Sequence, residues 1–128
     1  MFTAEDVEAY AVLTGDRNPI HVDADYARAT AFGHVIVHGG LTTGLFSALI
    51  AAELPGPGSV LLKQTWDYLG PVQIGEAISA EVEVLESRAD KPLVRVRCSA
   101  SRSDGTVVLQ GESLVYCMKP SSPIEPIR

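Results

Sequence analysis

The residues of this chain that could do chemistry gather in the stretch TGDRNPIH, residues 14–21. It places a carboxylate, Asp16, and an imidazole, His21, on either side of the turn-forming pair Asn18-Pro19. Because proline restricts the backbone, such a turn can bring both side chains toward one point. A carboxylate beside an imidazole can hold one water and carry protons in both directions. The alternative is a surface Asx-Pro turn with an incidental histidine, since such turns are common.

A second group of residues weighs against the incidental turn. About seventeen residues after His21, His38-Gly39-Gly40 opens an apolar segment that reads as a helix. Free backbone N–H groups at the N-terminus of a buried helix attract negative charge. A thioester carbonyl placed there would be polarised, and an enolate oxygen would be stabilised. An acid, a base and an oxyanion donor are the parts needed to add water next to a carbonyl.

Length and composition set the frame for this site. The 128 residues are expected to form a single domain, residues 1–128, and 46% of them are apolar, which excludes a disordered chain. A net charge of −6 and a pI of about 4.9 argue against nucleic-acid or anionic-membrane partners. No signal peptide is recognisable, and the apolar region 41–52 is too short to span a bilayer. Cys98 and Cys117 lack CxxC spacing and are expected to be reduced core thiols of a cytoplasmic protein.

The first half of the chain is expected to be helical. Thr3 is a good N-cap, with Asp6 in the acidic position of a capping box. Phe2 and Val7 can form a hydrophobic staple across that cap. Gly15 is a natural stop, so Asp16 should lie on a loop just past the helix end.

Two further helices are expected before the pattern changes. Asp23 can cap a short helix within DADYARA. A long central helix, about residues 40–53, is apolar nearly all round and is expected to be buried on most sides. The sequence Pro55-Gly56-Pro57-Gly58 ends it.

From Ser59 onward the apolar residues alternate with period two, which predicts strands. Four strands are expected, in VLLKQTWDYL, AISAEVEVLE, LVRVRCSAS and VVLQGESLVYCMK. The inner face of the second strand is expected to carry Ile78, Ala80, Val82 and Val84. We therefore predict an α+β fold, with a curved antiparallel sheet wrapped around the long central helix. Residues 119–128 are expected to be a loose tail.

The motifs resemble those of the MaoC-like (R)-specific enoyl-CoA hydratases, also called hydratase 2, which have the hot-dog fold. The resemblance rests on G-D-x-N-P-x-H, residues 15–21, followed by F-x-x-x-I-V-H-G, residues 32–39, and extends over nearly the whole chain. It implies reversible hydration of trans-2-enoyl-CoA to (R)-3-hydroxyacyl-CoA. It implies no metal and no organic cofactor, with coenzyme A present only as part of the substrate. A homodimer or a higher hot-dog oligomer is also implied.

The resemblance assigns roles to individual residues. Asp16 and His21 match the catalytic pair, and Gly39 matches the glycine whose N–H holds the thioester oxygen. Asn18 matches the asparagine that orders the loop. Ser47 aligns with a serine near the site of close relatives, although a helical serine often bonds to its own backbone instead.

Three further residues are expected near the site. His38 is expected to pack and hydrogen-bond beside the site, and Leu41 and Leu45 to help close the substrate slot. A metal pair of His34 and His38 is not expected, because GHVIVHGG reads as extended and a third ligand is not evident.

One departure from the resemblance concerns the start of the chain. Relatives commonly carry another strand before the first helix, whereas here the helix is expected to begin at Thr3. The usual first strand is therefore expected to be absent, either through a different start site or in a shortened member.

Other functions of the same fold stay open at this point. A dehydratase of 3-hydroxyacyl groups on acyl carrier protein would use the same residues, but the acidic carrier would demand a basic rim that this chain shows only weakly. A thioesterase usually lacks the D-x-N-P-x-H loop. A non-catalytic acyl-thioester-binding subunit would be signalled by loss of Asp16 or His21, and both are present.

Overall fold

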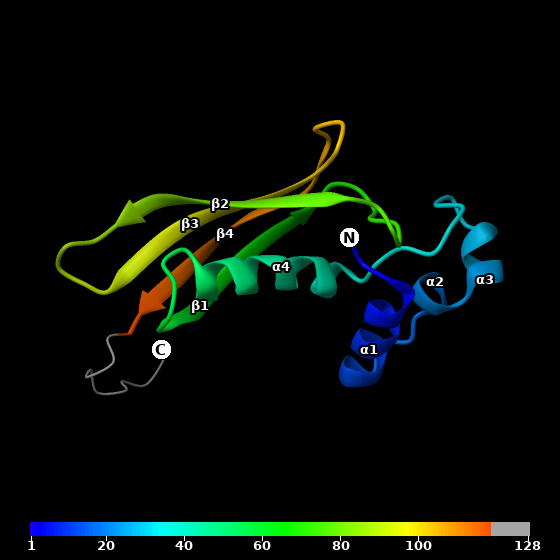
Figure 1. Cartoon of the computed structure of the whole chain (residues 1–128), viewed down its shortest axis with the longest axis horizontal. Coiled ribbons are helices and arrows are strands. Elements are labelled where there is room, and N and C mark those ends of the chain that lie inside the picture. Colours follow the sequence, from blue (N-terminus) through cyan, green and yellow to red (C-terminus); the bar gives the residue numbers. More distant parts are fainter. Residues whose placement is uncertain (119–128) are drawn as a thin grey trace.

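The structure, a computed structural model, describes residues 1–118, so the tail predicted at 119–128 lies outside the described residues. Four helices precede four strands. They are α1 (Ala4–Thr14), α2 (Pro19–Val22), α3 (Ala24–Arg28), α4 (Gly39–Ala52), β1 (Ser59–Tyr68), β2 (Ile78–Ser87), β3 (Leu93–Arg102) and β4 (Val107–Cys117). Helix α4 lies along one face of the curved sheet, and α1, α2 and α3 gather near one end of it (Figure 1).

The sheet is antiparallel throughout, with the strand order β1-β4-β3-β2. The four predicted strands are confirmed. The predicted alternation of inward apolar residues is confirmed in β3, where Val96, Cys98 and Ala100 are buried. A long helix against a curved antiparallel sheet is the α+β hot-dog arrangement expected from the sequence. Within residues 1–118, no strand precedes α1.

The inner face of β2 is less protected than predicted. Val84 pairs with the buried Val96, and partners in an antiparallel pair point to the same face. Even so, Val84 is 40% exposed, because β2 is an edge strand. The register shifts between Val84 and Glu86, so Leu85 is an extra residue there.

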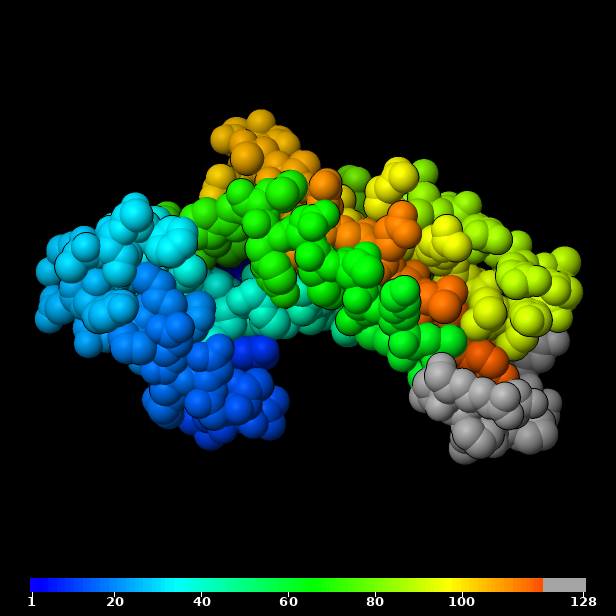
Figure 2. Space-filling model, turned by 180° about the vertical axis from the view of Figure 1, so that it is seen from behind, coloured from blue at the N-terminus to red at the C-terminus, as the bar shows by residue number. Residues whose placement is uncertain are grey.

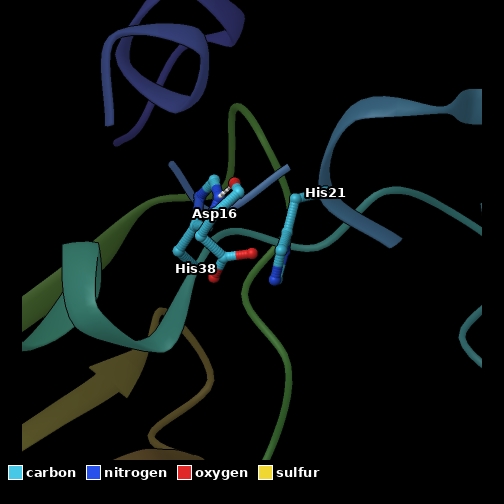
Figure 3. A group of neighbouring side chains, drawn as sticks. All are labelled: Asp16, His21 and His38. Carbon is cyan, nitrogen blue, oxygen red and sulfur yellow. Dashed lines mark hydrogen bonds between the residues drawn. The ribbon is translucent and has the colours of Figure 1, made fainter. Parts of the chain in front are cut away.

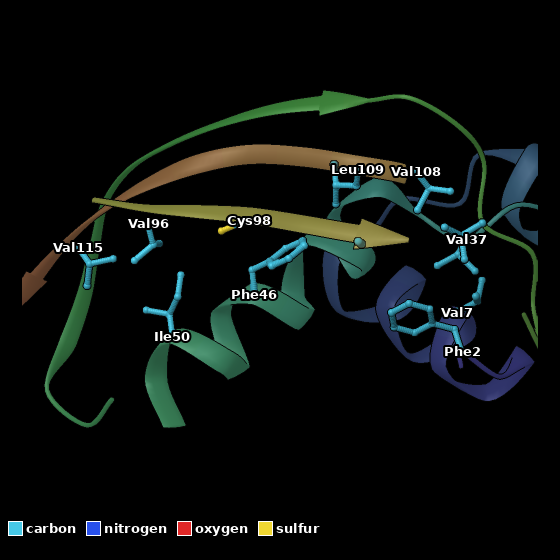
Figure 4. Packing of buried hydrophobic residues seen from close by; sticks show 12 residues of the cluster. Phe2, Val7, Val37, Phe46, Ile50, Val96, Cys98, Val108, Leu109 and Val115 are labelled. Carbon is cyan, nitrogen blue, oxygen red and sulfur yellow. The ribbon is translucent and has the colours of Figure 1, made fainter. Parts of the chain in front are cut away.

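Helix α4 is held to the sheet by one stripe of side chains. Thr42, Phe46 and Ile50 are spaced by four residues, so they share one helical face, and all three are buried. The ring of Phe46 stacks on Trp66 of β1 at 5.1 Å between ring centroids. Figure 4 shows Phe46 and Ile50 pointing from the helix toward the strands.

The expectation that the central helix is buried on most sides is wrong for the single chain. The outer residues of α4 are exposed, including Gly44, Ser47, Ala48 and Ala51. One chain covers only the stripe that faces its own sheet. The apolar composition of the other faces therefore has no partner within residues 1–118.

Helix α1 begins and ends as predicted. The Thr3 N–H donates to Asp6 Oδ2 at 2.9 Å, and the Asp6 N–H donates to Thr3 Oγ1 at 3.1 Å, which completes the capping box. Phe2 and Val7 are both buried in the core cluster. At the other end, Gly15 has φ of 80° and its N–H bonds to a carbonyl of the last turn. This left-handed glycine turns the chain directly into Asp16.

Both cysteines are free, as predicted. Cys98 is buried beneath the sheet and Cys117 is half-buried. Burial raises the pKa of both thiols, which keeps them protonated and poorly nucleophilic near neutral pH. None of the helices described within residues 1–118 is long and apolar enough to cross a membrane.

Candidate active site

The loop after α1 is ordered by its own side chains. Asp16 Oδ1 accepts a hydrogen bond from the Asn18 N–H at 3.2 Å, and Asn18 Oδ1 accepts one from the Ile20 N–H at 3.3 Å. Asn18 is thereby the N-cap of the short helix α2, and Pro19 occupies its first turn. The turn predicted at Asn18-Pro19 is thus the start of a helix that the sequence reading missed. It projects His21 back toward Asp16.

The orientation of His21 is set by a backbone carbonyl. His21 Nδ1 lies 2.7 Å from the carbonyl oxygen of Ile36. A carbonyl can only accept, so the proton of the neutral ring belongs on Nδ1. This leaves Nε2 with its lone pair, in the form that a general base requires.

Asp16, His21 and His38 form one cluster. One polar side-chain atom from each lies within 4.8 Å of the others. In Figure 3 the Asp16 carboxylate extends toward the His21 ring. Two groups at such a separation can share one water through two hydrogen bonds of about 2.8 Å each. The geometry therefore supports a water held between Asp16 and His21.

The structure places His38 immediately behind this pair. Its side chain is 1% exposed, and its Nε2 donates to the carbonyl oxygen of Asp16 at 2.9 Å. Its ring stacks on His21 at 4.0 Å between centroids and touches Tyr10 of α1 at 4.6 Å. His38 is also the N-cap residue of α4.

The cluster is a poor metal site for a geometric reason. His21 Nδ1 and His38 Nε2 both face backbone carbonyls, so these nitrogens are donors and not ligands. Of the atoms that remain without such a bond, His21 Nε2 and the Asp16 carboxylate are accessible, whereas His38 Nδ1 is fully buried. Zinc sites normally take three or four protein ligands, and only two accessible groups remain here.

A cavity of about 350 Å³ opens beside the cluster. It lies between the start of α4, the connection from β1 to β2, and the start of β4. Its walls are mostly apolar. The lining residues nearest to the predicted chemistry are His21 and Gly39, and the others include Phe32, Thr42, Tyr68, Leu69, Val108 and Leu109.

Not every predicted site residue reaches this cavity. Asp16 is exposed beside His21 and does not line the cavity. Ser47 is exposed on α4, and Leu41 and Leu45 pack against the core at one flank of the helix. The cavity therefore gives no support to Ser47, Leu41 or Leu45 as substrate contacts, and these three assignments stay predictions.

The first backbone donors of α4 are available to a ligand. Among the hydrogen bonds formed within residues 1–118, none uses the N–H of Gly39 or Gly40. The helix has fourteen residues, so its N-terminus carries a partial positive charge. A side chain on Gly39 would press against the Tyr68 ring at 2.6 Å, and one on Gly40 would collide with the Tyr10 hydroxyl. The two glycines thus keep this helix end bare and closely packed.

Comparison with known proteins shows where the chain belongs. A model of the MaoC like domain matches residues 1–103. A 3-hydroxybutyryl-CoA dehydratase of Methylorubrum extorquens is 44% identical over 91% of this chain and 74% of its own length. This chain is a member of the MaoC-like domain family. An (R)-specific enoyl-CoA hydratase of Aeromonas caviae is 41% identical over 89% of this chain and 85% of its own length.

A solved structure of an A. caviae (R)-hydratase involved in PHA biosynthesis supports the same conclusion for the fold. It matches the MaoC-like chain with a TM-score of 0.88 and 40% identity. The match covers 91% of this chain and 89% of the other. The recognised family and the hot-dog fold are therefore confirmed.

Several parts of this MaoC-like site were not predicted from the sequence. The Ile36 carbonyl that orients His21 leaves no side-chain signal. Tyr68 and Leu69 were predicted only as part of a strand, although Tyr68 ends β1, Leu69 follows it, and both line the cavity together with Gly39. The one available signal was their place just before Gly70-Pro71, where a strand end meets a turn.

Two glycines of α4 allow a matched test of the close packing at the helix start. Gly44→Ala meets no atom of its own chain within 4 Å, so in the dissociated chain the better helix propensity of alanine should raise the free energy of unfolding by up to about 1 kcal/mol. Gly40→Ala collides with Tyr10, so we expect it to lower the same quantity. Urea denaturation of both variants measures the contrast. Equal gains in both variants would show that the helix start is not tightly packed.

Proposed function

We propose that this MaoC-like protein adds water to trans-2-enoyl-CoA thioesters, giving (R)-3-hydroxyacyl-CoA, and catalyses the reverse dehydration. The observation that carries the proposal is the Asp16–His21 pair, placed beside an apolar cavity and the bare N-terminus of α4. The named activities of the two relatives at 44% and 41% identity support this reaction, and the name of the second supports its (R) stereochemistry.

In the proposed mechanism the Asp16 carboxylate and His21 Nε2 hold one water. The water oxygen attacks Cβ of the enoyl group, and the π electrons move toward the carbonyl. The water gives up one proton to the Asp16–His21 pair, and the pair delivers a proton to Cα on the same face, so that the hydroxyl on Cβ and the hydrogen on Cα together account for one water. The negative charge that gathers on the thioester oxygen is held by the Gly39 N–H at the positive end of α4.

The proposed reaction uses no metal and no organic cofactor. Hydration transfers no electrons, and water supplies every atom that is added to the substrate. A helix N-terminus can stabilise the enolate charge that a metal would otherwise hold. Coenzyme A enters only as the carrier of the acyl group.

The carrier could instead be acyl carrier protein, which a dehydratase of 3-hydroxyacyl groups would use with the same site residues. An acidic carrier protein docks through an extended basic surface, whereas coenzyme A needs only its acyl and thioester end in the cavity. Each of the six arginines within residues 1–118 forms an ion pair with a carboxylate. Among the arginines and lysines within residues 1–118, this leaves only Lys63 and Lys91 without an ion pair, so we favour coenzyme A.

A purely acyl-binding role would need no Asp16–His21 pair, and a thioesterase usually lacks the D-x-N-P-x-H loop. Both are therefore weaker candidates for this chain.

We also propose a cytoplasmic location, because two unpaired thiols suit a reducing compartment. Recovery of the native protein in a membrane or secreted fraction would contradict this location.

We propose that the protein acts as a homodimer or a higher hot-dog oligomer. The exposed face of α4 is rich in alanine and glycine, and β1 is an edge strand with unpaired backbone groups on one side. Figure 2 shows that β1, in green, runs across the surface on this side of the molecule. An exposed helix face and an exposed edge are the surfaces that a second copy would cover.

The catalytic pair is tested by conservative substitutions. Asp16→Asn removes the charge that draws the water proton, and His21→Gln removes the ring that carries it. Each should lower the hydration rate of crotonyl-CoA by about 10²- to 10⁴-fold, measured as loss of absorbance of the enoyl band. The thermal midpoint should stay within a few degrees, because the changed side chains lie in a polar loop.

Asp25→Asn and His34→Gln are the matched controls, since both residues lie outside the cluster and the cavity. They should leave the rate unchanged. The same assay with crotonyl-acyl carrier protein as substrate ranks the two carriers. Near-normal rates in Asp16→Asn or His21→Gln would remove the proposed mechanism.

The oxyanion donor is tested by a complex with 3-hydroxybutyryl-CoA. Because Gly39 acts through its backbone, no side-chain deletion removes it, so a structure of the complex is the better probe. The thioester oxygen should lie about 2.7–3.1 Å from the Gly39 nitrogen, and the 3-hydroxyl should contact Asp16 and His21. A thioester oxygen that faces solvent would rule out this donor.

The proposed assembly is tested by size-exclusion chromatography with light scattering. A molar mass of about twice 13.6 kDa, or a larger multiple, is expected at assay concentrations. Thr65→Lys on the edge strand β1 offers a probe, because it adds a charge at an exposed neutral position and added charge opposes edge pairing, so the variant should shift toward the monomer. A stable and fully active monomer would contradict the proposal.

A further inference from the structure

His38 touches each part of the proposed machinery without facing the cavity. Its Nε2–H holds the Asp16 carbonyl at 2.9 Å, and its ring lies against the His21 ring at 4.0 Å. Its own backbone is the N-cap of α4, directly before Gly39. One side chain therefore touches the residue that carries the acid and the ring that serves as the base, and it is bonded to the residue that supplies the oxyanion donor. His38 does not line the cavity.

The burial of His38 indicates that packing alone does not explain a histidine here. Nδ1 is fully buried and has no hydrogen-bond partner within the described part of the chain. A buried polar atom without a partner costs stability, so an apolar ring of similar size would serve a purely structural role better. The polar feature that the structure does use is the Nε2–H donor to Asp16.

The stack around His38 continues to α1. The Tyr10 ring lies against the His38 ring at 4.6 Å between centroids, and the Tyr10 hydroxyl lies over Gly40. The ring of His38 is therefore confined by Tyr10 and His21, as well as by its own helix start. A confined ring can transmit the position of α4 to the loop of Asp16, because tightly packed groups have little freedom to move separately.

We propose that His38 is a positioning residue of the hydration reaction, whose Nε2–H hydrogen bond to the Asp16 carbonyl holds the catalytic loop in register with the N-terminus of α4. This inference rests on the proposed function of Asp16, His21 and Gly39. His38 takes no proton from the substrate and makes no contact with it. Its effect is to keep the water-holding pair and the oxyanion donor at a constant separation, on which the rate depends steeply.

Three substitutions separate the hydrogen bond from the ring. His38→Gln places an amide N–H near the position of Nε2, so it can keep the bond to Asp16 while losing the ring. His38→Phe keeps a ring that can stack on His21 but cannot donate. His38→Asn carries its amide nitrogen near the position of Nδ1 and cannot reach Asp16, so it is the matched control for His38→Gln.

The inference predicts opposite rank orders for stability and turnover. The thermal midpoint of His38→Phe should equal or exceed that of His38→Gln, because the phenyl ring fills the buried site without a stranded polar atom. The kcat for crotonyl-CoA should fall by about a hundredfold in His38→Phe and in His38→Asn, and by clearly less in His38→Gln. KM should change little, because the cavity-lining residues are untouched. A kcat that simply follows the thermal midpoint would overturn the inference.

A spectroscopic readout tests the same bond without catalysis. Nitrogen-15 NMR of the histidine rings should show His38 as the Nε2–H tautomer and His21 as the Nδ1–H tautomer. In His38→Phe the NMR signals of two groups should shift or broaden: the backbone amide of Arg17, which follows the Asp16 carbonyl, and the His21 ring. In His38→Gln the same signals should resemble those of the wild type. Unchanged signals in His38→Phe would overturn the inference. If the wild type hydrates neither crotonyl-CoA nor crotonyl-acyl carrier protein, the proposed function is wrong. The NMR signals would still show whether the hydrogen bond from His38 to the Asp16 carbonyl is present.

Discussion

The site depends on the burial of one helical stripe against a curved sheet. Thr42, Phe46 and Ile50 fix α4 along the concave face, and this determines where the N-terminus of the helix comes to lie. Burial of the Phe46 and Ile50 side chains contributes about 1.5–3 kcal/mol each to the stability of the fold, more than an exposed ion pair contributes. The bare N–H groups at the helix start therefore have a constant place in space. Every other part of the site is arranged around that place.

The loop that carries the acid and the base is ordered locally and then attached to the helix start. Gly15, Asn18 and Pro19 shape it through a left-handed turn, an N-cap and a helical first turn. The attachment runs through two histidine rings, since His21 bonds to the Ile36 carbonyl and His38 bonds to the Asp16 carbonyl. Local order alone would leave the loop free to move as a unit. The two ring–carbonyl bonds tie it to the segment that leads into α4.

Much of this arrangement could be predicted from the sequence, and the reason differs from part to part. The capping box of Thr3 and the stop at Gly15 depend on neighbours a few residues away, so the sequence shows them directly. The catalytic assignment of Asp16 and His21 came from motif spacing and resemblance. The exposure of the outer faces of α4 and of Val84 could not be predicted, because an apolar composition does not say whether the same chain or another chain covers an apolar surface. The role of His38 required a contact 22 residues away in the chain, which no periodicity reports.

The orientation of the site relies on backbone carbonyls more than on charges. The acceptors that orient His21 and His38, from Ile36 and Asp16, are peptide oxygens, and these neither titrate nor vanish when a side chain is exchanged. The ion pairs described within residues 1–118 are mostly exposed, as Arg28–Asp25 and Arg97–Glu83 illustrate, and the pair in the catalytic loop, Arg17–Glu8, orients neither ring. Exposed pairs are weakened by salt, whereas hydrogen bonds to buried rings are screened much less. The described part of the chain thus keeps most of its charges at the surface and orients the two histidine rings with groups whose strength changes little with ionic strength. Such a frame suits a reaction in which one water and one proton must be held within hydrogen-bonding distance throughout the cycle.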